Sequence, residues 1–239
     1  MDWSLYRGLL PPLLTSGLIS SINFALFEKI KFVLEKDDDS KHISLKTVFI
    51  AGSIAGGFIS LMTTPIGLIK VQQQTVSTKG LFQCISYLYK NYGIKGFYKG
   101  YGPMFIMESF GRGVYLWTYE YVKRLLEPEN QRKDNSLSTK IIAASSAGCF
   151  SWASVYPLDV IKSRVQADIG NNTYRSSFDC LRQTWNEGES NNKHFKFYGG
   201  IRALTRGLGF TLLRAAPVAS MVLPVYDSVY YFLEGYLVV

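Results

Sequence analysis

An internal repeat is the feature that most constrains how this chain of 239 residues folds. A base followed by glycine recurs in three places, Tyr6-Arg7-Gly8, Tyr98-Lys99-Gly100 and Thr205-Arg206-Gly207. Nineteen residues after each glycine comes an aromatic residue followed by an acid, in Phe27-Glu28, Tyr119-Glu120 and Tyr226-Asp227. One offset shared by three segments predicts a chain built from three related structural units.

A proline motif repeats with the same spacing. The hexapeptide Pro65-Ile-Gly-Leu-Ile-Lys70 matches Pro157-Leu-Asp-Val-Ile-Lys162, and the separation of 92 residues equals that between Gly8 and Gly100. Small residues precede each proline, at 52–56 and 144–148. Small residues four apart let membrane helices approach closely, so we expect tight helix packing there.

Hydropathy predicts an all-α membrane protein. Apolar segments lie at about 8–34, 45–77, 101–126, 137–168 and 207–237. Each exceeds the roughly 20 residues that cross a bilayer. Amphipathic stretches follow at roughly 80–91 and 175–187, and the polar residues 188–198 are expected to form a loop insertion. The repeats divide the chain into the units 1–36, 37–128 and 129–239.

Composition qualifies this prediction. Charged residues make up 18% of the chain, below the roughly 25% of soluble domains, yet the mean hydropathy is only +0.06. Spanning helices must therefore be amphipathic, with polar faces turned away from lipid into a shared interior.

The chain is basic, with a net charge of +8. Such a charge suits anionic lipid, an anionic substrate or nucleic acid. The sequence has no zinc-ligand spacing or nucleic-acid-binding motif, so we expect no nucleic-acid partner. The three cysteines, Cys84, Cys149 and Cys180, lie too far apart to suggest a metal site. No nucleophile, catalytic carboxylate pair or cofactor loop is evident, and we predict a transporter without cofactor or metal rather than an enzyme.

Together these motifs resemble the mitochondrial carrier family over essentially the whole chain. The resemblance implies a mitochondrial carrier fold of three repeats, each with two spanning helices and a short matrix helix. The chain would begin inside the first repeat, which leaves about five of six spans and two matrix amphipathic helices. The runs 213–218 and 113–120 are most similar to the carnitine/acylcarnitine and basic amino-acid branch, although Met107 stands where that branch usually has a base.

The resemblance also implies two gates of paired charges. The matrix gate would use Pro65, Lys70, Pro157, Asp159 and Lys162, and the cytoplasmic gate Glu28, Lys31, Glu120, Lys123 and Asp227. Gly67 replaces the expected acid of the second repeat. Lys162 would seek an acid at that position, while Lys70 and Asp159 would seek partners on an upstream helix. We therefore expect no complete matrix-side ion pair within this chain.

The base–glycine motifs lie where alternate spanning helices begin. Free backbone N–H groups and the helix dipole favour phosphate at such places. Cardiolipin is the ligand that the resemblance implies, bound at Arg7, Gly8, Lys99, Gly100, Arg206 and Gly207. Equally, these could be bases reaching the interface beside turn glycines.

Substrate contacts are implied seven residues after each repeat glycine, at Thr15, Met107 and Arg214. Arg214 suits a carboxylate or phosphate, and the neighbouring Glu108 suits an ammonium. Opposite charges favour a zwitterion such as an amino acid or an acylcarnitine. If Glu108 instead pairs with Arg112, four residues on, Arg214 dominates and an anionic nucleotide or coenzyme becomes the alternative.

The predicted function is solute transport by alternating access, as a monomer in the mitochondrial inner membrane with several spans. Two alternatives follow from the incomplete first repeat. The chain could be a shortened, transport-incompetent form that binds lipid or membrane partners. It could also be part of a longer carrier.

Overall fold

The computed structural model describes residues 10–35, 44–75, 80–126, 137–169, 173–191 and 196–221. Within these ranges the chain is helical and contains no strand. The helices are α1 (Leu10–Glu35), α2 (Leu45–Thr75), α3 (Leu81–Gly96), α4 (Tyr101–Leu126), α5 (Leu137–Ala167), α6 (Ser177–Asn191) and α7 (Lys196–Leu204). Residues 208–221 form a further helical segment. The all-α prediction is confirmed.

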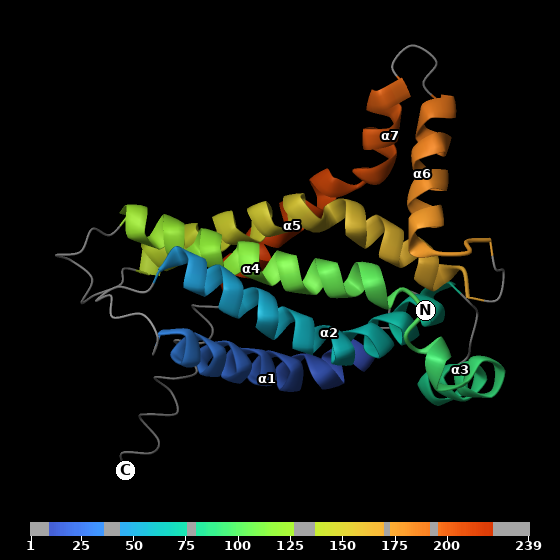
Figure 1. The fold of residues 1–239 in the computed structure, drawn as a ribbon, viewed down its shortest axis with the longest axis horizontal. Coiled ribbons are helices and arrows are strands. Elements are labelled where there is room, and N and C mark those ends of the chain that lie inside the picture. The colour runs from blue at the N-terminus through green and yellow to red at the C-terminus, as the bar shows by residue number, and fades with distance from the viewer. Residues whose placement is uncertain are drawn as a thin grey trace, which may run out of the picture.

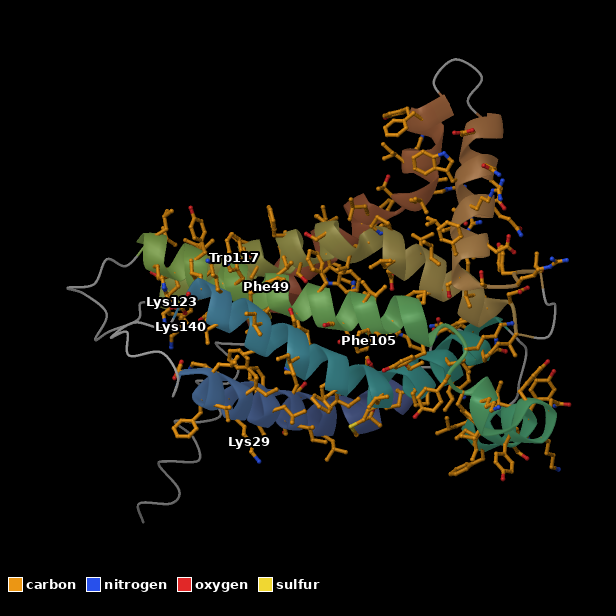
Figure 2. All side chains as sticks on the ribbon, in the orientation of Figure 1. Lys29, Phe49, Phe105, Trp117, Lys123 and Lys140 are labelled. Carbon is orange, nitrogen blue, oxygen red and sulfur yellow. The ribbon has the colours of Figure 1, made fainter. Side chains whose placement is uncertain are left out.

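The long helices α1, α2, α4 and α5 lie side by side and pack in chain order (Figure 1). The shorter α3 and α6 both lie toward one end of this bundle, apart from each other (Figure 1). Lys123 and Lys140 mark the opposite end (Figure 2). The predicted repeat boundaries, after residues 36 and 128, fall outside the described residues and stay a prediction.

Helices α2 and α5 share one design. Each is 31 residues long and continues through its proline, Pro65 or Pro157. Beyond each proline a short helix packs a cysteine against the bundle. Cys84 of α3 joins a cluster with Leu68, and Cys180 of α6 joins one with Ile161. The predicted amphipathic stretches are therefore helices that cover one end of the bundle.

Small residues bring α2 and α4 into backbone contact, as predicted. A Cβ added at Gly56 would clash with the carbonyl of Glu108, and one at Gly113 would clash with the hydroxyl of Ser53. Ser109 donates a hydrogen bond of 2.7 Å to the Ser53 carbonyl across the same interface. The close approach fixes where α4 presents its charged side chains.

The outer surface of the bundle is apolar. On α2, Ile50, Ile54, Phe58 and Leu61 form an exposed stripe, while Ser60 and Thr64 are fully buried. Such a reversed pattern suits lipid outside and a polar interior. Among the described helices, α2 and α5 are long and apolar enough to cross a membrane by length and composition.

The segment 188–198 differs from its prediction as a loop at both ends, while residues 192–195 lie outside the described residues. Helix α6 runs on to Asn191, and α7 begins at Lys196 and returns alongside it. The two helices form a hairpin that projects from the bundle (Figure 1). Gly188 lies against the backbone of Gly199, and the ring of Trp185 covers Gly200. The sequence prediction missed these contacts because they form between two helices and follow no local spacing.

Candidate functional site

The central site lies between α4 and α5. A cavity of about 260 Å³ is lined by Met107, Glu108, Gly111, Arg112, Tyr115, Ser151, Trp152 and Val155. Its charged side chains come from α4, which Gly111 brings close to Val155 of α5. Ser151 reinforces the contact by donating a hydrogen bond of 2.8 Å to the Gly111 carbonyl.

Glu108 and Arg112 form an ion pair within this cavity. The Nε of Arg112 donates to Oε2 of Glu108 at 2.8 Å, and the carboxylate is mostly buried. The pair is the one that the sequence offered as an alternative. Among the predicted contacts, Arg214 lies on segment 208–221, with its guanidinium 6.0 Å from the ring centroid of Trp152. A guanidinium over an indole face is held by a cation–π attraction.

The remaining predicted contacts contribute differently. Met107 is buried in an apolar cluster with Met104 and Val155, so it fills the α4–α5 interface. Thr15 is half-buried on α1. The structure therefore places Glu108 and Arg112 in the cavity, whereas Arg214 is exposed and touches the cavity lining only through Trp152.

The residues predicted for the matrix gate gather on α2 and α5. Lys162 faces Gly67, because a Cβ added to that glycine would lie 3.7 Å from Nζ of Lys162. None of the ion pairs among the described residues involves Lys70, Asp159 or Lys162. The expectation that the matrix-side charges lack complete pairs within this chain stays a prediction.

Three of the five residues predicted for the cytoplasmic gate line a second cavity. Glu28, Lys31 and Glu120 line about 340 Å³ between α1, α2, α4 and segment 208–221. Lys31 lies 3.4 Å from Glu28 on its own helix. Lys123 is half-buried at the end of α4, and Asp227 lies outside the described residues.

The structure assigns Glu120 a partner that the sequence prediction missed. Arg124, four residues on, donates to its carboxylate at 2.8 Å. The four-residue spacing on one helix could have revealed this pair. Trp152 was also missed, because its contact with Arg214 joins separate segments and leaves no local pattern.

Two of the predicted cardiolipin sites lie in the described residues. Gly100 and Gly207 have φ angles of +82° and +96°, and each turns the chain into the following helix. Lys99 donates to the backbone carbonyl of Asp168 at 3.1 Å. Arg206 lines a cavity of about 350 Å³ with Arg164 and Arg202. Arg7 and Gly8 lie outside the described residues.

Asp168 partly offsets the charge of Lys99. Burial alone would raise the pKa of Asp168. Hydrogen bonds from Tyr174 and Thr173, together with the nearby Lys99 ammonium, lower the pKa by more than burial raises it. The net effect holds the pKa of Asp168 below its ordinary value. The carboxylate is therefore ionised near neutral pH and stays beside Lys99.

A bundle with an apolar exterior, a charged interior cavity and ionic groups toward both ends defines a membrane solute carrier. The family model described as mitochondrial carrier protein matches residues 41–130 and 133–237. The chain belongs to this family, whose members are transporters.

Curated relatives include amino-acid carriers. A mitochondrial arginine transporter of Arabidopsis thaliana is 30% identical over 94% of this chain and 72% of its own length. A mitochondrial basic amino acids transporter of Bos taurus is 33% identical over 90% of the chain and 68% of its own length. A glutamate/glycine mitochondrial carrier of Schizosaccharomyces pombe is 27% identical over 94% and 74%.

Proposed function

We propose that this protein carries an amino acid across the mitochondrial inner membrane by alternating access. The observation that carries the proposal is a cavity lined by Glu108 and Trp152, with the exposed Arg214 lying over the ring of Trp152. An amino acid presents a carboxylate and an ammonium, which need one base and one acid. The names of the relatives support an amino acid, and none of the three mentions an acylcarnitine.

In this proposal Arg214 binds the carboxylate. A guanidinium can hold a carboxylate through two parallel hydrogen bonds. The ring of Trp152 would orient the Arg214 guanidinium through the cation–π contact. Arg112 donates to Oε2 of Glu108, and a carboxylate has acceptor capacity for more than one donor. Glu108 can therefore receive the substrate ammonium while it remains paired.

The ion pair supports a second candidate. Because Arg112 partly neutralises Glu108, Arg214 would dominate for an anionic solute such as a nucleotide or a coenzyme. The two candidates differ in whether the solute needs an ammonium group.

The two gates and the lipid sites complete the proposal. Charges toward each end would pair when that side closes, and substrate binding would favour the exchange between the two closed states. Cardiolipin would bind at the helix starts after Lys99 and Arg206, and the carrier would work as a monomer. These assignments rest on the resemblance of the motifs to the family.

Uptake into cardiolipin-containing liposomes tests the proposal, with labelled amino acids, acylcarnitines, nucleotides and carboxylates offered in turn. We expect saturable uptake of an amino acid. Glutamate and 2-oxoglutarate differ in the ammonium group, so Glu108→Gln should reduce glutamate uptake more than 2-oxoglutarate uptake. Glu189→Gln, on α6, is the matched control. Uptake of nucleotides or coenzymes alone would favour the second candidate, and no uptake of any class would contradict both.

A further inference from the structure

The ammonium of Lys162 lies over a glycine where the matching helix carries an acid. Gly67 holds the place in α2 that Asp159 holds in α5. A Cβ added at Gly67 would lie 3.7 Å from Nζ and 3.9 Å from Cε of Lys162. Beyond the backbone of α2, no other atom of the described residues comes within 4 Å of that point. Lys162 therefore faces a gap that an acidic side chain would fill.

Lys162 has charged neighbours of both signs. Its electrostatic neighbours are Asp159 and Glu108, which attract it, and Lys70, which repels it. Glu108 is already paired with Arg112. The family pattern pairs Lys70 and Asp159 with an upstream helix, so Lys162 is the charge near this point for which neither the described residues nor that pattern supplies a partner.

A cation in a half-buried position is costly unless an anion accompanies it. Within the described residues Lys162 makes no hydrogen bond and no ion pair. Its three N–H donors are therefore available to a carboxylate, which would form short, charge-assisted hydrogen bonds.

We propose that Lys162 binds a second carboxylate of the solute, so that this carrier selects acidic amino acids. This inference rests on the proposed function, in which Arg214 binds the first carboxylate. An acidic amino acid has two carboxylates and one ammonium. Arg214, Lys162 and Glu108 supply the complementary set of two bases and one acid.

A basic amino acid fits these charges less well. It has one carboxylate and two cationic groups, which require two acids without partners. Glu108 is paired with Arg112, so among the described residues near this point Asp159 is the one acid without an ion pair. The glycine at position 67 withholds the further acid that such a solute would use. Selectivity between acidic and basic amino acids would thus depend on whether position 67 of α2 carries an acid.

The test compares glutamate with glutamine, which has the same shape without the second charge. Uptake by liposomes and ligand-induced thermal stabilisation of the purified protein should both favour glutamate, on the order of tenfold in half-saturating concentration. Lys162→Gln should abolish this preference. Gly67→Asp should abolish it too, because the new carboxylate would neutralise Lys162. Thermal stabilisation keeps the test valid if Gly67→Asp closes the gate and stops uptake.

Gly67→Asn separates charge from volume and should retain a preference for glutamate. A preference that persists unchanged in both Lys162→Gln and Gly67→Asp would overturn the inference while leaving amino-acid transport intact. Equal wild-type responses to glutamate and glutamine would overturn it as well, as would a wild-type preference for arginine. Failure of every amino acid to bind or enter would instead overturn the proposed function together with this inference.

Discussion

Helices α2 and α5 repeat one design but meet different neighbours. Both are 31 residues long with an internal proline, and each has a small residue at the matching position, Gly56 or Gly148. Gly56 lies against the backbone of Glu108, whereas Gly148 faces Ala219, whose Cβ would lie 3.1 Å from a Cβ added to Gly148. The comparison teaches that a repeated motif fixes the course of a helix, while single side chains determine what each copy can do.

The largest expected effect comes from adding a methyl group to these two glycines. Gly56→Ala places a Cβ against the Glu108 carbonyl, so α2 and α4 must separate. Overpacking that moves backbone costs about 3 kcal/mol. Gly148→Ala needs only a small shift of Ala219 and should cost about 1 kcal/mol. Thermal unfolding of the purified variants measures both, and equal losses would show that the two interfaces are equivalent.

The next largest loss of stability is expected when alanine replaces the glycines in the turns that start α4 and segment 208–221. Both Gly100 and Gly207 have positive φ, which costs an alanine about 1–2 kcal/mol. At Gly207 the new Cβ would also lie 2.7 Å from the hydroxyl of Tyr156, which donates to the Arg206 carbonyl at 2.9 Å. Gly207→Ala should therefore lower the unfolding temperature more than Gly100→Ala. The reverse order would mean that the Tyr156 hydrogen bond contributes little.

The smallest losses of stability are expected for substitutions seven residues after each proline, at Gln72 and Arg164. In α2, the buried Gln72 donates to the Gln166 carbonyl at 2.7 Å. In α5, Arg164 pairs with Glu187 at 2.8 Å where both side chains are partly exposed. We expect Gln72→Ala to cost about 1–2 kcal/mol and Arg164→Ala less than about 1 kcal/mol. A larger loss for Arg164→Ala in chemical unfolding would contradict this ranking.

The sequence predicted what depends on period and spacing. The apolar segments located the long helices, the small residues indicated the close α2–α4 contact, and the four-residue spacing offered the Glu108–Arg112 pair. The resemblance placed Lys162 opposite Gly67, and the geometry agrees. These features are local, or they follow from one repeat lying beside the next.

The rest depends on contacts between segments that share no pattern. Nothing in the sequence linked Arg214 to Trp152, because the two residues approach only when segment 208–221 lies beside α5. The amphipathic stretch at 175–187 corresponds to most of α6, but the end of α6 and the start of α7 were assigned to a loop because their close glycine contacts form only between the two helices. Glu120 was assigned to a gate on the family pattern alone, so its pairing with Arg124 was overlooked.

Equilibrium binding most directly tests the central claim that Arg214 and Glu108 hold an amino acid inside the bundle. Labelled glutamate would be titrated onto the purified protein in cardiolipin-containing micelles, so that binding is separated from translocation. We predict saturable binding that weakens on the order of 10- to 100-fold in Arg214→Ala, because a charge-assisted contact is lost. Arg182→Ala, an exposed change on α6, should leave binding as it is. Undiminished binding in Arg214→Ala would contradict the account.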